Sequence, residues 1–459
     1  MADGTDVVFR PTVPARGKRP AGLLAFLWKN WRDPLTAYSE QNFTEPFVFF
    51  TGRGGASINV TDPAGVRHVL LDNAGNYEKG LFQRRVFGPL IASGLLLADG
   101  EDWRRARRIL APLFTPTKTF KLAADMKAVC ERRVAAWPLP SDGAAILDID
   151  MEMTRITFEI ISETMFSNVI GGEAEEFERA FHGFVETTGR IDPLDLLGVP
   201  PWVPRLGKLA GKRYVAFFEK RVNRLIAERR AMIEGGDAPD DLLSALLRAR
   251  DTEDGGALSE AEVSANVLTF IMAGHETTAR ALGWALHLVS RTPDVQARLR
   301  AEADAFDLAD PDWQAAMPWT RAVLDETMRL YPPAPTTLRF PLQDDVICGQ
   351  PIPAGTRVGI SPYIIHRHKS LWSDPEAFRP ERFLPGARET IDRFSFLPFS
   401  QGPRICIGAS FAIQEALIAL ATILKAVEIE PTGEPEPMPS HRITLRAKNG
   451  IRLQVRRRS

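Results

Sequence analysis

The chain has 459 residues, of which 44% are hydrophobic, so it can bury a sizeable core in one large domain or in two smaller ones. Its 57 basic and 58 acidic residues leave a net charge of -1, which excludes the strongly basic surface typical of nucleic-acid-binding proteins. The 3 cysteines lie far apart, which indicates neither a disulfide framework nor a zinc site. We therefore expect a globular protein of a reducing, cytoplasmic compartment that does not bind nucleic acid.

The first part of the chain is locally basic and contains an apolar run at 21–28. This run is too short for a transmembrane helix, which needs about 20 residues, so no membrane anchor is expected. A signal peptide is a second interpretation, but a small-residue cleavage site is missing. We favour an amphipathic first helix, and we predict an N-terminal arm at 1–30 followed by a single domain at 31–459.

Two short strands are predicted after this arm, at 46–51 and 57–60. The glycines at 52–55 between them indicate a hairpin turn. They lack the third glycine of a dinucleotide-binding loop, so neither a nicotinamide nor a flavin site is predicted.

Most of the remaining chain has the periodicity of helices, and the longest predicted helix starts at Ser259. Ser259 and Glu262 form a capping box, and the helical pattern continues to about Arg291. Further short strands are predicted at 337–340, 346–348 and 357–361. The expected fold class is mainly α with a small β portion.

Two motifs on predicted helices carry residue types that suit a cofactor site. Trp103 and Arg107 are four residues apart and would share one helix face. In the longest helix, Gly274 costs roughly 1 kcal/mol relative to Ala, so we expect it to let something bulky approach. Thr277 can donate to the carbonyl of Ala273 and bend the helix. Alone, these motifs also suit a basic surface helix and a dented core helix.

Opposite charges at Glu326 and Arg329 lie three residues apart on one predicted helix face. Such a pair is usually a surface contact worth a few tenths of a kcal/mol. A second basic motif follows at 378–383 and contains Arg382. Buried together, these charges would need to be paired and hydrogen-bonded.

The segment from Phe399 to Gly408 has the residue pattern of a loop that presents a single cysteine thiolate to a metal ion. Cys406 is followed by a long apolar run that predicts a helix, and the positive end of this helix would lower the pKa of the thiol. Gly402 and Gly408 would allow tight turns around it. Arg404 could reach an anionic edge group of a flat cofactor. A buried, inert cysteine is the alternative.

Together and in this order, the motifs resemble those of the cytochrome P450 superfamily, from roughly residue 31 to the C-terminus. The resemblance implies the cytochrome P450 fold, with haem b between the long helix and the cysteine segment. Cys406 would be the iron ligand, and Glu326, Arg329 and Arg382 would form the family's buried triad. The implied haem-site residues are Trp103, Arg107, Ala273, Gly274, Arg339, Phe399, Gly402, Arg404, Cys406 and Gly408.

The resemblance also implies monooxygenation, in which one oxygen atom of dioxygen enters a hydrophobic organic substrate. Glu276 and Thr277 would supply protons. A peroxide-driven or isomerising haem-thiolate enzyme is one alternative, and a non-catalytic haem-binding or gas-sensing protein is another. The expected pocket is apolar, and its candidate residues are Phe82, Phe87, Asn266, Phe270, Thr336 and Thr337.

Electrons are expected from a separate ferredoxin or flavodoxin-type donor, because the sequence has no nucleotide-binding motif of its own. Arg104 and Arg108 share a helix face and are predicted to present positive charge to such an acidic partner. A monomer is expected.

Overall fold

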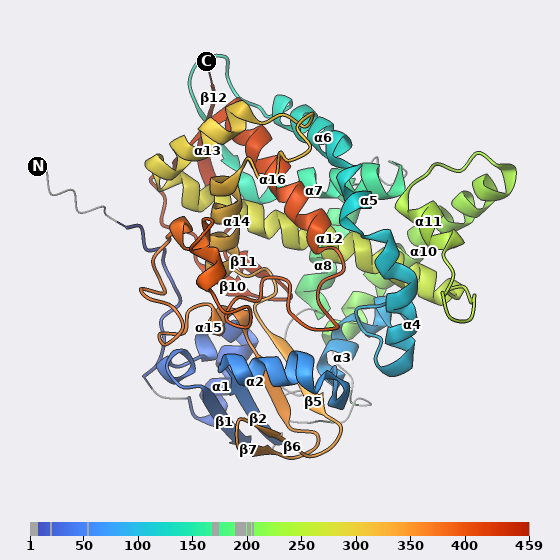
Figure 1. Cartoon of the computed structure of the whole chain (residues 1–459), viewed down its shortest axis with the longest axis vertical. Coiled ribbons are helices and arrows are strands. Elements are labelled where there is room, and N and C mark those ends of the chain that lie inside the picture. The colour runs from blue at the N-terminus through green and yellow to red at the C-terminus, as the bar shows by residue number, and fades with distance from the viewer. Residues whose placement is uncertain are drawn as a thin grey trace, which may run out of the picture.

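The computed structural model describes residues 8–18, 21–52, 55–167, 174–188, 199, 203 and 206–458. Its helices are α1 (Leu23–Arg32), α2 (Pro63–Arg67), α3 (Leu81–Ile91), α4 (Gly100–Leu110), α5 (Pro116–Phe120), α6 (Ala123–Ala135), α7 (Ile149–Phe166), α8 (Ala174–Thr188), α10 (Leu206–Gly235), α11 (Leu242–Arg248), α12 (Glu260–Ser290), α13 (Pro293–Ala305), α14 (Pro318–Leu330), α15 (Pro362–Ile365) and α16 (Ala409–Ala426). Its strands are β1 (Phe47–Gly52), β2 (Gly55–Val60), β3 (Tyr77–Glu78), β4 (Ala145–Asp148), β5 (Thr337–Pro341), β6 (Asp345–Ile347), β7 (Gln350–Ile352), β8 (Arg357–Ile360), β9 (Val427–Pro431), β10 (Pro439–His441), β11 (Leu445–Ala447) and β12 (Arg452–Arg457). Figure 1 shows β1, β2, β5, β6 and β7 gathered at one end of a mainly helical molecule. The predicted fold class is confirmed.

α12 runs through the helical part and packs against α7, α14 and α16. Its start is fixed by the predicted capping box. Glu262 N–H donates to the Ser259 hydroxyl at 3.3 Å, and Ser259 N–H donates to the Glu262 carboxylate at 2.7 Å. Nearly every residue from Val263 to Ser290 is buried, as expected of a helix at the centre of a core.

One sheet has the strand order β1-β2-β8-β5-β3. β1 and β2 pair antiparallel, with Phe47 opposite Val60 and Gly52 opposite Gly55. β8 pairs parallel with β2 and antiparallel with β5. The strands predicted at 46–51, 57–60, 337–340, 346–348 and 357–361 correspond to β1, β2, β5, β6 and β8.

A second sheet near the C-terminus was missed by the sequence prediction. In it β12 lies between β4 and β9. β12 alternates the buried Leu453 and Val455 with exposed residues, which is the pattern of a half-buried strand. Its pairing with the distant β4 depends on tertiary contacts, which periodicity along the chain does not reveal.

The predicted boundary between an arm at 1–30 and a domain at 31–459 falls inside α1, which is the expected first helix. The described residues before α1 contact the domain directly. Arg16 Nη2 lies 2.5 Å from Glu376 Oε1, and the guanidinium of Arg16 lies 3.6 Å from the ring centre of Phe43. The described residues of this predicted N-terminal arm therefore pack on the domain.

α16 directly follows the cysteine segment, where the sequence predicts a helix. Within the described ranges, it alone is long and apolar enough to cross a membrane by length and composition. Most of its length is buried against other helices, and core helices often have the same composition. This single match is weak evidence for a membrane span.

Candidate functional site

The cysteine loop, residues 399–408, is closed by its own backbone. Cys406 N–H donates to Phe399 O at 2.9 Å. Gly402 has a φ of 75°, and a Cβ added to it would lie 1.9 Å from the carbonyl oxygen of Leu70. Only glycine fits both this conformation and this close approach. The loop therefore depends on Gly402, as predicted for a tight turn.

The sulfur of Cys406 lies at the start of α16. Gly408 is the N-cap of this helix and lies in a turn with a φ of -92°, and its backbone N–H faces the sulfur. The surrounding protein atoms raise the pKa of the Cys406 thiol, while the Gly408 N–H and the charge of Arg107 act in the opposite direction. The expected lowering of the pKa is thus outweighed by desolvation. Because a metal ion deprotonates a coordinating thiol outright, the loop still suits a metal-bound thiolate.

A cluster of cations lies beside the loop. Arg404 Nη2 donates to Asp99 at 2.6 Å, and its guanidinium lies 4.4 Å from the ring centre of Trp103. Burial and the nearby Arg404 lower the pKa of Arg339 to about 10. Burial and the charges of Arg404 and Arg339 lower the pKa of Lys79 to about 7. This excess of positive charge suits the anionic edge groups of a ligand.

Arg107 makes a contact that the sequence did not predict, and Lys79 is a site residue that the sequence did not predict. Arg107 Nη1 donates to the carbonyl oxygen of Ile405 at 2.9 Å, so it braces the cysteine loop in addition to lying near the sulfur. Lys79 follows the two-residue strand β3 and belongs to no motif, so sequence reasoning missed it. Its place beside Arg404 and Arg339 is a tertiary contact that no local pattern could have revealed.

One turn of α12 is less buried than the turns around it. Ala273 is exposed, and Gly274 and Thr277 are partly exposed. Thr277 Oγ1 donates to Ala273 O at 2.8 Å, as predicted. A Cβ added to Gly274 would lie 2.6 Å from Ile161 Cδ1, so this glycine admits α7 and not a ligand. Exposed small side chains on a core helix leave room for a flat group beside Ala273.

Glu276 is buried and held by several donors. Arg280 donates from Nε and Nη2 at 3.0 and 3.1 Å, and the Thr444 hydroxyl donates at 2.9 Å. Arg446 Nε donates at 3.1 Å, and Arg280 also pairs with Asp150 on α7. Burial by itself would raise the pKa of Glu276, but the charges of Arg280 and Arg446 hold it well below its usual range. Glu276 is therefore a carboxylate at neutral pH.

A polar pocket of about 340 Å³ opens beside this carboxylate. Its walls come from α7, α8, α12 and the segment around β11. The pocket contains both acidic and basic side chains, so water can occupy it and reach Glu276. Sequence reasoning missed Arg280, Thr444 and Arg446, because two of these residues come from a distant part of the chain.

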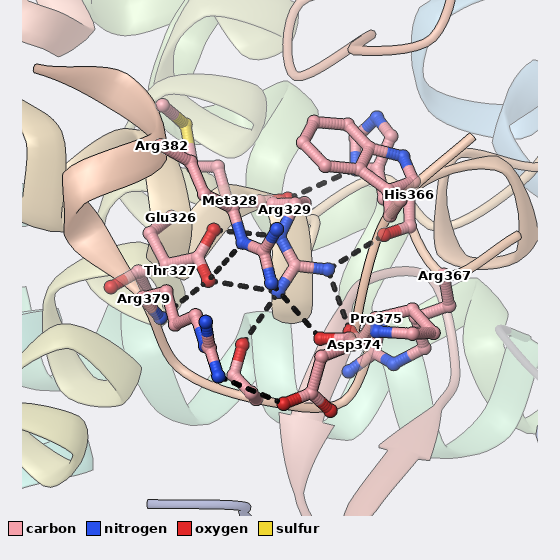
Figure 2. A network of polar contacts seen from close by, with 12 residues as sticks. Glu326, Thr327, Met328, Arg329, His366, Arg367, Asp374, Pro375, Arg379 and Arg382 are labelled. Atoms are coloured by element: carbon pink, nitrogen blue, oxygen red, sulfur yellow. Dashed lines mark hydrogen bonds and ion pairs between the residues drawn. The ribbon is translucent and has the colours of Figure 1, made fainter. Parts of the chain in front are cut away.

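Glu326 and Arg329 on α14 form a fully buried, bidentate ion pair (Figure 2). Arg329 Nε lies 2.6 Å from one carboxylate oxygen and Nη2 lies 2.8 Å from the other. Arg329 also donates to the backbone carbonyls of His366, Pro375 and Ala377, at 2.8, 2.7 and 2.9 Å. A buried guanidinium is thus satisfied by one carboxylate and three main-chain acceptors.

Arg382 is the third member of this group, although its contact is looser (Figure 2). Its Nε lies 3.6 Å from Glu326 Oε1, and its Nη2 donates to Asp374 O at 3.0 Å. The backbone N–H of Arg379 donates to the same carboxylate at 2.8 Å. The structure brings the three predicted residues together and adds a main-chain donor to them.

Comparison with known proteins agrees with this geometry. The Cytochrome P450 family profile matches residues 23–455. The chain belongs to the cytochrome P450 family. It is 32% identical to the pentalenene oxygenase of Streptomyces avermitilis over 94% of both chains. It is 33% identical to the cyclooctat-9-en-7-ol 5-monooxygenase of Streptomyces melanosporofaciens, over 92% of this chain and 91% of that one.

A third relative, the cyclooctatin synthase of Streptomyces melanosporofaciens, is 33% identical over 84% of this chain and 83% of its own length. Similarity over nearly the whole chain to proteins named as an oxygenase and a monooxygenase identifies the activity. This cytochrome P450 is a haem-thiolate monooxygenase that acts with dioxygen, a substrate and a redox partner.

Two predicted pocket residues of this P450 are buried contacts. Asn266 is 0% exposed, its Oδ1 accepts Leu95 N–H at 2.9 Å, and its Nδ2 donates to Glu262 O at 2.8 Å. It therefore ties α12 to the segment after α3 and has no surface left for a substrate. Phe270 packs edge-on against Phe114, with 5.0 Å between ring centres.

Three other predicted pocket residues of the P450, Phe87, Thr336 and Thr337, lie nearer the surface. Phe87 on α3 is half-buried, and the side chain of Phe82 is outside the described part of the structure. Thr336 Oγ1 lies 3.0 Å from the hydroxyl of Tyr38, and Thr337 accepts a bond from the buried arginine two residues later. Both threonine hydroxyls are therefore engaged within the protein.

The predicted docking pair on α4 is not free positive charge. Arg108 donates to both carboxylate oxygens of Asp251, at 3.0 and 2.9 Å, and lies 3.0 Å from Glu253. Arg104 pairs with Glu101. These acidic neighbours come from a loop and from the same helix, and they neutralise the face that was expected to bind an acidic partner.

Proposed function

We propose that this P450 binds haem b without a covalent bond and inserts oxygen into a C–H bond of a hydrophobic organic substrate. The bound haem would supply the activation of dioxygen. The observation that carries the proposal is the cysteine loop, in which Cys406 stands at the start of α16 and Gly402 leaves no room for a side chain. The chain has no CxxCH motif for covalent attachment.

The residues around the loop would hold the haem. Cys406 would bind the iron, and Phe399 would pack near the ring. Arg339, Arg404 and Lys79 would pair with the haem carboxylates, which would offset their excess positive charge. The remaining proposed haem-site residues are Trp103, Arg107, Ala273, Gly402 and Gly408.

Glu276 and Thr277 would move protons within the site. Because Glu276 is ionised, its carboxylate would accept hydrogen bonds from water in the adjoining pocket of about 340 Å³ and so orient the water that carries protons toward the site. Thr277 would present its hydroxyl on the partly exposed side of α12. The hydrogen bond from this hydroxyl to Ala273 O fixes the position of Thr277 Oγ1. Proton entry and oxygen binding would thus use different sides of one helix.

The substrate would be apolar and of the kind named for the relatives. Pentalenene is an alkene by name, and cyclooctat-9-en-7-ol is an alkenol. Phe87 would contribute apolar surface, and Thr336 and Thr337 would border it. We propose cyclic alkenes and alkenols as the first substrate class to test.

Electrons would come from a separate ferredoxin or flavodoxin-type protein. β1 and β2 pair antiparallel with Gly52 opposite Gly55, as in a hairpin, and the rest of the sequence has no nucleotide-binding motif. The P450 would act as a monomer in the cytoplasm, in keeping with 3 widely spaced cysteines.

Substrate-induced spin-state changes test this proposal. The purified holoenzyme would be titrated with pentalenene, cyclooctat-9-en-7-ol and polar analogues of similar size. We expect a saturable shift of the Soret band with the apolar compounds only, and a product that carries one atom from isotopically labelled dioxygen. Absence of both signals across a library of hydrophobic compounds would reject the proposed substrate class.

A further inference from the structure

His366 lies between the buried ion pair of α14 and the cysteine loop. It directly follows α15, it is 0% exposed, and its backbone carbonyl accepts a 2.8 Å hydrogen bond from Arg329 Nη1 (Figure 2). Arg329 is itself fixed by its bidentate pair with Glu326. The main chain of His366 is therefore anchored to a rigid, fully buried charged group.

The imidazole ring of His366 engages the segment that leads into the cysteine loop. Leu397 N–H donates to Nε2 at 2.7 Å. A backbone N–H can only donate, so Nε2 is unprotonated and Nδ1 carries the ring hydrogen. Nδ1 lies 3.3 Å from Met328 O on α14, which accepts that hydrogen. The ring also packs on Phe396, with 5.2 Å between ring centres.

The contacts continue from Leu397 to the thiolate ligand. Phe399 follows Leu397 by two residues, and its carbonyl accepts the N–H of Cys406 at 2.9 Å. Burial and the charge of Arg329 lower the pKa of His366 to about 3, so Nε2 remains an acceptor at physiological pH. Hydrogen bonds and one short chain segment thus connect Arg329 to Cys406 through this ring.

We infer that His366 is a positioning residue, which fixes the cysteine loop relative to the Arg329 guanidinium through the bond between its Nε2 and Leu397 N–H. The inference rests on the proposed role of Cys406 as iron ligand. His366 touches neither the sulfur nor a substrate, and it acts only by holding the main chain of the loop. A histidine that merely filled space would leave ligation unchanged when a polar side chain replaced it.

Two substitutions each keep one half of the hydrogen bonding of the ring. In His366→Gln the carboxamide reaches the place of Nε2, so its oxygen can accept Leu397 N–H. In His366→Asn the shorter carboxamide reaches only the place of Nδ1, so it can bond to Met328 O but not to Leu397. Both side chains are uncharged carboxamides, so a difference between the two variants reports the Leu397 bond.

We expect the His366→Gln holoenzyme to keep the red-shifted Soret band of the ferrous carbon monoxide complex, which reports thiolate ligation. We expect His366→Asn to lose most of that band. Amide hydrogen exchange in the segment 394–399 should be about tenfold faster in His366→Asn than in His366→Gln, because a buried donor has lost its acceptor. Equal bands or equal exchange rates in the two variants would overturn the inference.

If neither variant folds, amide hydrogen exchange in the wild-type protein tests the inference. In the wild-type holoenzyme, the Leu397 amide should exchange as slowly as the core amides of α14, and fast exchange there would overturn the inference. A wild-type holoenzyme without the red-shifted band would instead overturn the proposed role of Cys406, whatever the His366 variants do. Failure of the two proposals is therefore distinguishable.

Discussion

Arg446 Nε on β11 donates a 3.1 Å hydrogen bond to the carboxylate of Glu276 in the middle of α12, although the two residues are 170 positions apart. The hydroxyl of Thr444 donates to the same oxygen at 2.9 Å. The β10–β11 hairpin therefore holds the carboxylate on the side of the polar pocket. This contact favours the charged form of Glu276, which has consequences for both stability and proton delivery.

Replacing Arg446 should destabilise the fold. Arg446→Met leaves the buried carboxylate of Glu276 with only its Arg280 and Thr444 donors, so we expect the free energy of unfolding to fall by about 2 kcal/mol. Arg452→Met is the matched control, because its ion pair with Glu434 is exposed. That variant should change stability by less than about 1 kcal/mol. Chemical denaturation measures the free energy of unfolding of both variants. Equal losses of stability in Arg446→Met and Arg452→Met would contradict a stabilising role of the buried network around Glu276.

Thr277→Ala should separate oxygen consumption from product formation. The variant should still consume dioxygen and reducing equivalents, but a several-fold larger share should appear as peroxide, because the hydroxyl that orients proton delivery is missing. Thr278→Ala is the control, since its hydroxyl donates to Gly274 O at 3.2 Å in the same way but is buried. Product and peroxide are measured per reducing equivalent. Unchanged coupling in Thr277→Ala would remove this residue from the mechanism.

Cys406→Ser should abolish the red-shifted Soret band of the ferrous carbon monoxide complex, because a serine hydroxyl does not replace a thiolate as ligand. Cys348→Ser is the control, because Cys348 is an exposed, free cysteine in the turn between β6 and β7. Its spectrum should match that of the wild-type protein. A normal band in Cys406→Ser would reject the assignment of the iron ligand.

Gly402→Ala should prevent the cysteine loop from closing. The new Cβ would lie 1.9 Å from Leu70 O at a φ of 75°, and a main-chain oxygen cannot turn away. We expect a loss of more than about 3 kcal/mol, together with poor haem retention. Gly386→Ala shares the positive φ, at 89°, but a Cβ there has open space. It should cost only about 1 kcal/mol, so similar effects of the two variants would argue against the clash.

Stability should fall in mild acid because of buried neutral histidines. Burial lowers the pKa of His287 from 6.5 to about 4, so the unfolded chain binds more protons than the folded one between these values. The contribution is fully present above 6.5 and is lost as the pH falls toward 4. At about pH 5 the loss for this residue is about 2 kcal/mol. The free energy of unfolding, measured above pH 6.5 and at about pH 5, should show this loss in the wild-type protein and a smaller loss in His287→Gln.

The buried ion pair of α14 illustrates how far sequence reasoning reached. The spacing of Glu326 and Arg329 places them on one helix face, and the resemblance to the family pointed to their burial. It did not reveal the three carbonyl acceptors of Arg329, which lie 37 to 48 positions farther along the chain. Nor did it reveal His366, because a single histidine carries no local pattern that separates a ring in the core from one that positions a loop.

The sequence by itself determined the features that depend on neighbours along the chain. These are the capping box of α12, the bond from Thr277 to Ala273, and the glycine turn before Cys406, because each needs only residues a few positions apart. The tertiary structure decided which charged groups are buried and which distant partners they have. Arg446 approaches from a distant strand and, together with Arg280 on the same helix, keeps the buried Glu276 ionised, while Asp251 pairs with Arg108. A charge depends on everything within a few ångströms, and distant segments supply those neighbours.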